Sequence, residues 1–400
     1  MQAQIKYVIG FLVALLILVV GYVWADLSFG TVTYMSETIL VSDMSTTTDS
    51  KEDTIPEVAK IIWPELLDTN DYDKRLLALV GYTPPVSEVV MSTSTTPSGA
   101  VITRASTTYA TTSALRYSSS TNVTIDGEKW PPAAVYPNRG AVLPFQRILA
   151  YYGNFYSRQM GILGELEPEE MLAHLANTKA KWEKADPTTP VLPAIEYIAM
   201  VAQADAGVDG MYRAVMPDKE IEKAYALAKE IDGVMILDIQ VGLSTVEVEL
   251  PKFKKYLERP DVFFAIDPEF SMKYGNKPGT VIGTFDATDI NYVIEYLSTI
   301  VREKHLPPKV LLVHRFTQDM VTHVSRIKPS PEVQVVMVMD GWGSKSLKYG
   351  TYSHVIEPEP VQFTGIKLFY KNDLKPPSSG LLSPAEVLDL QPSPIYIQYQ

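Results

Sequence analysis

Cysteine is absent from this 400-residue sequence, histidine is rare, and basic residues are outnumbered by acidic ones. Without cysteine the chain has no disulfide framework, thiolate nucleophile, cysteine metal ligand or lipobox-type lipid anchor. The formal net charge of −12 argues against nucleic-acid binding, which needs a clustered basic face. The five histidines show no H-x-H or H-E-x-x-H spacing, so we predict no metal and no cofactor. Hydrophobic residues, at 46%, suffice for a large core.

The longest apolar run lies close to the N-terminus. It extends from Tyr7 to Ala25 and is long enough to cross a bilayer as a helix. Lys6 precedes it, and acidic residues but no basic ones follow before Lys51, which predicts a cytoplasmic N-terminus and an extracytoplasmic remainder. We expect residues 1–30 to be a retained single-pass anchor in the cell membrane. The alternative is a signal segment that is cleaved near Ala25.

Residues 31–140 are expected to form a polar, extracytoplasmic stalk. Residues 31–55 and 91–124 are rich in Ser and Thr and carry too few apolar side chains to offset the entropy of ordering. Residues 56–82 regain apolar character, which predicts one or two short helices. The alternative for residues 91–124 is a small β domain, because Thr, Val and Tyr are frequent there.

Residues 141–400 alternate between short β-branched runs and segments with helical spacing. The runs are almost continuously apolar, as in parallel strands that are buried on both faces. The predicted strands are Ile148–Tyr152, Ala194–Ala202, Val234–Gln240, Val262–Asp267, Val310–His314, Val333–Asp340, Phe363–Tyr370 and Ile395–Gln398. Helices are predicted near residues 168–184, 218–231, 247–257, 288–304, 317–327, 345–355 and 383–389. This order predicts an α/β fold, a (β/α)8 barrel of the TIM type.

An open, doubly wound sheet is the alternative fold. It would normally carry a Gly-rich turn after its first strand, and residues 152–155 lack that fingerprint. No helix follows the last predicted strand. We expect the segment before Arg147 to cover the gap that this leaves.

Polar residues converge on the end of the barrel where the strands finish. The long connections 153–167, 203–217 and 268–287 all follow strands, at the rim where such barrels bind ligands. Charges within apolar strands are costly unless they are paired or face a wet cavity. The sequence therefore predicts an acidic pocket with an aromatic rim. Its candidate substrate-binding residues are Tyr152, Glu196, Asp238, Gln240, His314, Trp342, Lys367, Tyr370 and Gln398.

The candidate catalytic residues are Asp267, Glu269 and Asp340. Residues two apart at a strand end can face one cavity, so one carboxylate can raise the pKa of the other and create a general acid for glycoside hydrolysis. Asp340, two strands away, would orient an acetamido group or activate water. Each residue also has a structural interpretation: Asp267 as a helix or turn cap, His314 as a satisfied core histidine, and Lys367 as a counter-charge.

Two family resemblances add to these patterns. Asp267-Pro268-Glu269 and Met337-Val338-Met339-Asp340 partly resemble the D-x-D-x-E and M-x-Y-D motifs of chitinase-like glycoside hydrolases. Ala265 stands where that family has its first aspartate, so the sequence departs from the motif that the family uses for substrate-assisted hydrolysis. The stretches LAYYGNF, FAIDPEF and LFYKND resemble an uncharacterised family of exported bacterial proteins. This second resemblance implies the barrel and export, and it brings no activity.

The leading functional hypothesis is a membrane-anchored glycoside hydrolase that acts on cell-envelope or extracellular polysaccharide. The alternative is a non-catalytic glycan-binding or surface-structural protein. A third hypothesis is a metal-dependent hydrolase that uses Asp238, Asp267, His314 and Asp340. The expected partners are a glycan ligand and the membrane, with no nucleic acid, and the sequence does not predict an oligomeric state.

Overall fold

A computed structural model describes residues 64–82, 89–95, 101–107 and 114–400. The predicted anchor, residues 1–30, lies outside these described residues, and so do residues 31–63 of the predicted stalk. Within the described ranges, no helix combines the length and the hydropathy that crossing a bilayer requires.

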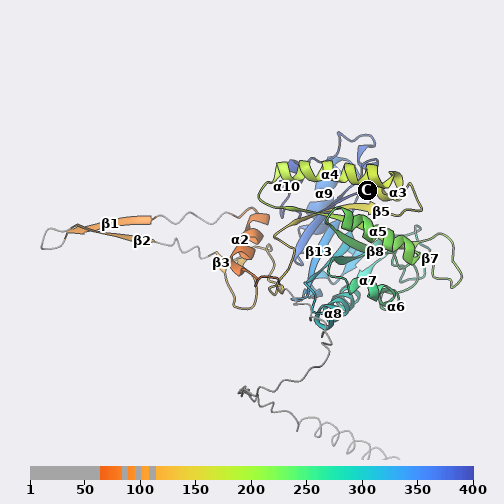
Figure 1. Cartoon of the computed structure of the whole chain (residues 1–400), viewed down its shortest axis with the longest axis horizontal. Coiled ribbons are helices and arrows are strands. Elements are labelled where there is room, and N and C mark those ends of the chain that lie inside the picture. The colour runs from red at the N-terminus through yellow and green to blue at the C-terminus, as the bar shows by residue number, and fades with distance from the viewer. Residues whose placement is uncertain (1–63, 83–88, 96–100, 108–113) are drawn as a thin grey trace, which may run out of the picture. The chain divides into compact units, whose positions relative to one another are not determined.

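Eight parallel strands form a closed barrel, in which the last strand pairs with the first (Figure 1). A short strand, β7 (Arg213–Val215), adds to β6 in antiparallel orientation. The barrel strands are β5 (Arg147–Gly153), β6 (Val191–Ala202), β8 (Val234–Ile239), β9 (Val262–Ile266), β11 (Lys309–Arg315), β13 (Val333–Met339), β14 (Phe363–Leu368) and β15 (Tyr396–Tyr399). Each coincides with a predicted strand, and the closure shows a TIM-type α/β barrel in place of the doubly wound alternative.

Side chains along each strand alternate between the barrel interior and the helices outside. In β5, Ile148 and Ala150 belong to the interior cluster, whereas Leu149 and Tyr151 belong to the outer one. All residues of β5 are buried, because the strand is covered on both faces. This explains why its sequence is almost continuously apolar.

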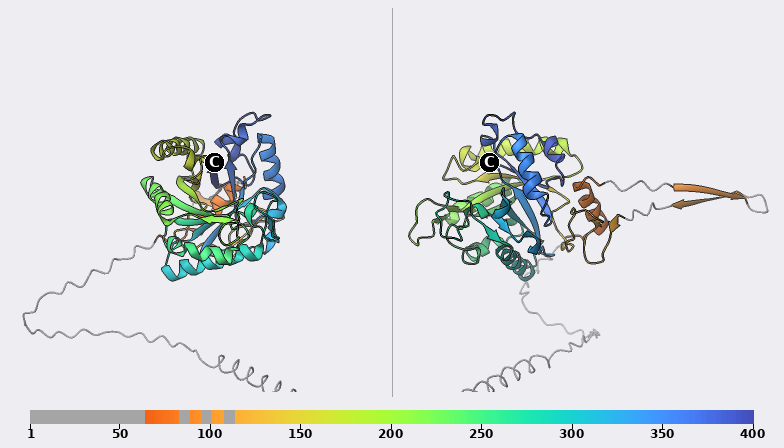
Figure 2. Two further views of the ribbon diagram at one scale, coloured as in Figure 1. Left: turned by 90° about the vertical axis from the view of Figure 1, so that its right-hand side faces the viewer. Right: turned by 180° about the vertical axis from the view of Figure 1, so that it is seen from behind.

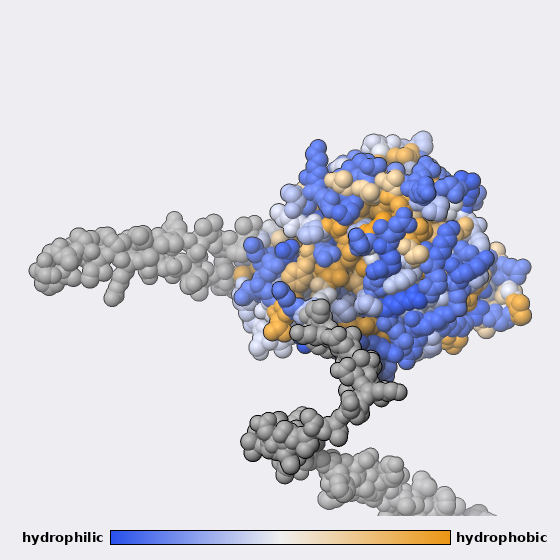
Figure 3. Space-filling view, in the orientation of Figure 1, coloured by the Kyte–Doolittle hydropathy of each residue, from blue (hydrophilic) through white to orange (hydrophobic). Residues whose placement is uncertain are grey.

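Helices surround the strands, as two further views also show (Figures 1 and 2). Hydrophilic residues cover the outer surface over α5 to α8, which leaves the apolar helix faces for the strands (Figure 3). In α8, for example, Ile290, Val293 and Leu297 are buried, and Asp286 forms a capping box with Asp289 at the first turn. The helices are α3 (Ile162–Glu165), α4 (Pro168–Ala185), α5 (Asp218–Glu230), α6 (Val246–Glu249), α7 (Lys254–Leu257), α8 (Ala287–Lys304), α9 (Lys345–Thr351) and α10 (Pro384–Leu388).

The predicted helix at residues 317–327 does not form. Two 3₁₀ turns and the short strand β12 (Val321–Thr322) occupy this segment, and β12 pairs with β10 (Phe285–Asp286). The cause is the carboxylate of Asp286, which accepts a hydrogen bond from Thr322 and contacts the ring of His323. These contacts hold the segment against the start of α8 in a non-helical conformation.

The segment before the first strand closes the N-terminal end of the barrel. Helix α2 (Thr69–Leu79) buries Tyr72 and Leu76 in the same cluster as Leu143 and the interior residues of the strands. Asp73 of this helix accepts hydrogen bonds from the Val123 backbone N–H and the Tyr136 hydroxyl, at 3.1 and 2.8 Å. Residues 69–79 and parts of 114–140 therefore belong to the folded body, whereas we expected them in the stalk.

The Ser/Thr-rich tract contains strands where an extended stalk was predicted. β1 (Val89–Thr95) and β2 (Val101–Thr107) form an antiparallel hairpin, and β3 (Leu115–Arg116) pairs with β4 (Thr124–Ile125). The β-branched residues Thr and Val fit extended backbone, which is the physical basis of the alternative interpretation of this tract.

Helices α4 and α10 meet over β15, where an eighth helix would otherwise lie. Trp182 of α4 is buried, and its indole N–H donates to the hydroxyl of Tyr399 at 3.2 Å. Tyr370 stacks on the ring of Tyr399, with ring centroids 5.0 Å apart. The gap beside β15 is thus covered by its helical neighbours, and the segment before Arg147 packs elsewhere, at the N-terminal end.

Candidate functional site

Several polar residues of the strands face the barrel interior in its C-terminal half. Glu196, Asp238 and His314 each follow, two positions later, an apolar interior residue of the same strand. Because side chains alternate with a period of two, the apolar and the polar residue share the inward face at different heights. The N-terminal half of the interior is consequently mostly apolar, with Gln334 hydrogen-bonded to the Leu143 backbone there, and the C-terminal half is a polar chamber.

A cavity of about 580 Å³ opens above this chamber at the C-terminal rim. Seven of the predicted site residues line it, namely Tyr152, Gln240, Asp267, Glu269, Asp340, Trp342 and Lys367. The other lining residues are Gln159, Met160, Ile198, Ala202, Phe270, Phe316, Gly341, Leu347, Thr351, Phe369, Asn372 and Gln400. Aromatic rings and a small set of carboxyl and amide groups therefore line the same cavity, as in most small-molecule sites.

Asp340 lies between two cationic or potentially cationic side chains. The ammonium of Lys367 is 3.1 and 3.4 Å from its two carboxylate oxygens, and Nδ1 of His314 is 3.3 Å from Oδ2. The same ammonium lies 3.9 Å from the centre of the Tyr152 ring, within cation–π range. All four side chains are buried, so their charges are poorly screened by solvent.

Asp267 and Glu269 occupy a 3₁₀ turn directly after β9. Asp267 caps this turn by accepting from the Glu269 backbone N–H at 3.0 Å, and it accepts from the Gln240 amide at 3.1 Å. Gln240 in turn accepts from the Ala202 backbone N–H, so its whole amide is used. Glu269 is only partly buried and lines the cavity, and no ion pair joins it to a cation among the described residues.

The surroundings shift the pKa values of the cavity carboxyls in opposite directions. Burial and the charge of Asp340 raise the pKa of Glu269 to about 7. Burial, together with Glu269 and Asp238, raises the pKa of Asp267 well above its usual range. Burial alone would also raise the pKa of Asp340, but Lys367 and His314 outweigh it and lower that pKa. At neutral pH the cavity therefore holds protonated and ionised carboxyls together.

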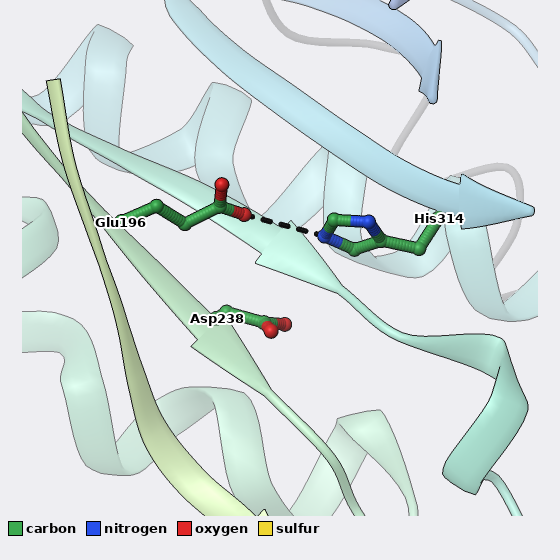
Figure 4. A group of neighbouring side chains, drawn as sticks. All are labelled: Glu196, Asp238 and His314. Carbon is green, nitrogen blue, oxygen red and sulfur yellow. Dashed lines mark hydrogen bonds and ion pairs between the residues drawn. The ribbon is translucent and has the colours of Figure 1, made fainter. Parts of the chain in front are cut away.

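Below the cavity, Glu196, Asp238 and His314 form a buried polar group from three strands (Figure 4). Nε2 of His314 lies 3.2 Å from Oε1 of Glu196, and the hydroxyl of Tyr396 donates to the other oxygen of Glu196. The hydroxyl of Tyr152 donates to Asp238 at 2.9 Å, while burial raises the pKa of Asp238 to about 6. One atom from each of the three residues lies within 4.8 Å of the others, a spacing that a cation could bridge.

Five of the predicted substrate-binding residues do not line the cavity: the three of this buried group, and Tyr370 and Gln398. Tyr370 projects outward and shares a hydroxyl cluster with Tyr151, Thr178 and α4, because it lies one position beyond the inward-facing Phe369. Tyr151 is on the outer face as well, because it lies one position before the inward-facing Tyr152. Gln398 is buried inside the barrel, with neither side-chain atom hydrogen-bonded among the described residues.

Sequence reasoning missed several apolar lining residues. Phe270 and Phe316 follow the ends of β9 and β11, so their position just beyond a strand was an available signal. Met160 comes from the long loop after β5, and nothing in its sequence context distinguishes it. Leu347 belongs to α9, whose approach to the cavity depends on tertiary packing.

A buried ion pair fixes the rim loop that carries Trp342. Lys348 of α9 lies 2.9 Å from Asp373, and both side chains are almost fully buried. Asp373 also accepts from the backbone N–H groups of Gly343 and Phe369, at 2.8 and 2.9 Å. One carboxylate thus joins the loop after β13 to the loop after β14, and both loops contribute aromatic lining to the cavity.

No protein-family model and no curated protein matches the sequence. Among solved structures, the chain is similar to the Bacillus subtilis mannanases BCman and man26 at 10% identity, over 64% of this chain. These alignments cover 81% and 80% of the mannanase chains, with TM-scores of 0.33 and 0.34. The chain is also similar to dihydropteroate synthase of Burkholderia cenocepacia, at 10% identity, with coverage of 64% and 86% and a TM-score of 0.32. Likenesses at this level do not bear on activity, so the function has to be argued from the site itself.

Proposed function

We propose that the barrel is a glycoside hydrolase in which Glu269 is the general acid and Asp340 is the second carboxylate. The observation that carries this proposal is that both carboxyl groups line one aromatic-walled cavity in unlike surroundings. Asp340 is paired with Lys367, whereas Glu269 has no such partner among the described residues. Two carboxyl groups with divided acid and base roles are the usual requirement of glycoside hydrolysis.

The charge states suit this division of labour. An acid that protonates a leaving oxygen must hold its proton near neutral pH, and the pKa of Glu269 is about 7. The second carboxylate must be ionised, either to attack the anomeric carbon or to activate water, and the pKa of Asp340 is lowered. Asp267 supports the acid by fixing the turn that carries Glu269.

The substrate that we propose is a cell-envelope or extracellular polysaccharide. Trp342 is 59% exposed at the mouth of the cavity and offers an apolar ring face to a pyranose. Export and anchoring are proposed from the apolar run Tyr7–Ala25 and its flanking charges alone. Membrane fractionation of cells producing the full chain tests this part: the protein should resist extraction by salt and be released by detergent.

Hydrolysis of a glycan panel by the full chain and its variants tests the catalytic assignment. Glu269→Gln and Asp340→Asn should each lower kcat by about 10²–10⁴-fold, the usual contribution of a positioned acid or base. Asp319→Asn is the matched control, because Asp319 is an exposed acidic residue just after β11 that does not line the cavity. For the wild type, kcat/KM should fall as the pH rises through about 7, since the acid form of Glu269 is the active one.

Two outcomes would contradict the proposal. Full activity in both carboxyl variants would remove Glu269 and Asp340 from the chemistry. Saturable saccharide binding without any hydrolysis product would favour the alternative, a non-catalytic glycan-binding protein that uses the same cavity. An activated aryl glycoside adds a second check: its leaving group needs little protonation, so Glu269→Gln should slow it much less than a natural glycan.

A further inference from the structure

We infer that His314 is a positively charged positioning residue that lies between Glu196 and Asp340 and holds Asp340 as a carboxylate. The catalytic meaning of this inference rests on the proposed function, but the charge of His314 can be measured without any substrate. His314 does not line the cavity, so it acts through Asp340 and not on the substrate.

The geometry places a carboxylate beside each ring nitrogen of His314. Nε2 is hydrogen-bonded to Oε1 of Glu196 at 3.2 Å, and Nδ1 is 3.3 Å from Oδ2 of Asp340, an ion-pair distance without hydrogen-bond geometry. A neutral imidazole carries one N–H, so its other nitrogen would direct a lone pair at a carboxylate. Only the imidazolium form offers an N–H to both neighbours.

The charges around His314 favour the same form. Glu196 on β6, Asp238 on β8, Asp267 and Glu269 just after β9 and Asp340 just after β13 are the acidic groups beside it. Lys367 on β14 is the nearby cation, and it is held by Asp340. The phenols Tyr152 on β5 and Tyr396 on β15 donate to Asp238 and Glu196. Lys367 compensates the charge of Asp340, and a positive charge on His314 compensates the second carboxylate beside the ring, Glu196, in this buried space.

The balance of effects on His314 agrees with its position. Burial alone would lower its pKa, but hydrogen bonds and charge interactions with Asp340 and Glu196 raise that pKa well above the usual value. The same pairing lowers the pKa of Asp340. A series of side-chain contacts, from Tyr396 through Glu196 and His314 to Asp340, thus crosses the barrel interior and ends at the carboxylate that lines the cavity.

A metal ion bound by Glu196, Asp238 and His314 is the rival interpretation of the same residues. A metal ligand must present a nitrogen lone pair, so a metal requires neutral His314. The two interpretations predict opposite protonation of one ring, which makes them separable by a direct measurement.

Nitrogen NMR of the full chain with ¹⁵N-labelled histidine rings tests the inference. His314→Asn assigns the signal among the five histidines. Both ring nitrogens of His314 should stay protonated from pH 6 to 8 in the wild type. In Glu196→Gln or Asp340→Asn, the ring should lose one of its two protons within this pH range. A neutral ring in the wild type at pH 7.5, no response to Asp340→Asn, or a shift of the signal by one equivalent of Zn²⁺ would each overturn the inference.

The pH profile of hydrolysis supplies the functional readout. In the pH profile of kcat/KM, His314→Gln should move the acid limb, which reports the ionisation of Asp340, to higher pH by about 1–3 units, the effect of removing an opposite charge from beside a carboxylate. The same variant should lower kcat with little change in KM. A purely structural role would reduce the folded fraction, seen by circular dichroism, without moving the limb. An unmoved limb in folded His314→Gln would overturn the inference, whereas a charged His314 in a protein that hydrolyses no glycan would overturn the proposed function alone.

Discussion

Replacing Asp373 by alanine should lower the free energy of unfolding by about 3–5 kcal/mol, the range for breaking a buried ion pair from one side. The carboxylate has three donors: the Lys348 ammonium at 2.9 Å and the backbone N–H groups of Gly343 and Phe369 at 2.8 and 2.9 Å. Its loss leaves a buried cation with the Lys367 carbonyl oxygen and the face of the Phe369 ring but no counter-charge in contact among the described residues, together with two backbone donors that have lost their acceptor.

The partner variant Lys348→Met should cost less, about 1.5–3 kcal/mol, which is the range for one hydrogen bond to a charged group. Asp373 keeps both backbone donors in this variant, and the methionine still fills the space beside the Phe369 ring. Guanidinium unfolding followed by far-ultraviolet circular dichroism measures both changes, provided that the m values agree. A loss for Lys348→Met equal to or larger than that for Asp373→Ala would refute this account of the ion pair.

The pH gives a second check of the same pair. Burial lowers the pKa of Lys348 to about 8 although Asp373 opposes the shift, so without Asp373 that pKa falls further. A folded state that binds fewer protons than the unfolded chain gains stability as the pH rises. The variant should begin this gain at lower pH than the wild type. The loss caused by Asp373→Ala should therefore be smaller near pH 8.5 than near pH 6, and an unchanged or larger loss would contradict the argument.

Three further predictions concern stability and need no substrate. The wild type should lose stability as the pH rises from 4.5 to about 7, because folded Glu269 retains a proton there that the unfolded chain releases; thermal melting should show a flatter slope in Glu269→Gln, and equal slopes would exclude the shift. Gly164→Ala would place a Cβ 2.3 and 2.4 Å from two backbone carbonyl oxygens and should cost about 1–3 kcal/mol, whereas Gly350→Ala, with open space around it, should be neutral or stabilising; similar melting temperatures would refute this. Leu76→Ala should lower the free energy of unfolding by about 2–5 kcal/mol in guanidinium, and the exposed control Leu66→Ala by at most about 0.5. A small loss for Leu76→Ala would contradict the packing of α2 against the barrel core.

The barrel was predictable because each strand is a short apolar run with a polar residue near its end. In β11, Val310, Leu312 and His314 lie at alternate positions, so the sequence alone places His314 on the same face as two core residues. The C-terminal rim was predictable because the long connections follow strands and not helices. These signals are local, and buried parallel strands express them strongly.

The height and facing of individual side chains were less predictable. Glu196 and Tyr152 are register partners, yet only Tyr152 reaches the cavity, because the surrounding strands and side chains decide how far each one extends. Tyr370 was assigned to the pocket although alternation through Lys367 and Phe369 turns it outward. The packing of α2 at the N-terminal end of the barrel depends on contacts between residues 50 or more positions apart, such as those of Asp73 with Val123 and Tyr136, which no local pattern reveals.

The pairing of β15 with β5 has a consequence for how the chain acquires its structure. Tyr399 lies in register with Tyr151, so the pairing that closes the barrel joins the two barrel strands that are farthest apart in the sequence. During synthesis, β5 is made first and can pair with β6, but its other edge has no partner until β15 emerges. Contacts of such long sequence separation slow folding, and an unpaired edge invites association with other chains. Truncations that remove β15 should therefore aggregate instead of accumulating as a soluble seven-stranded form.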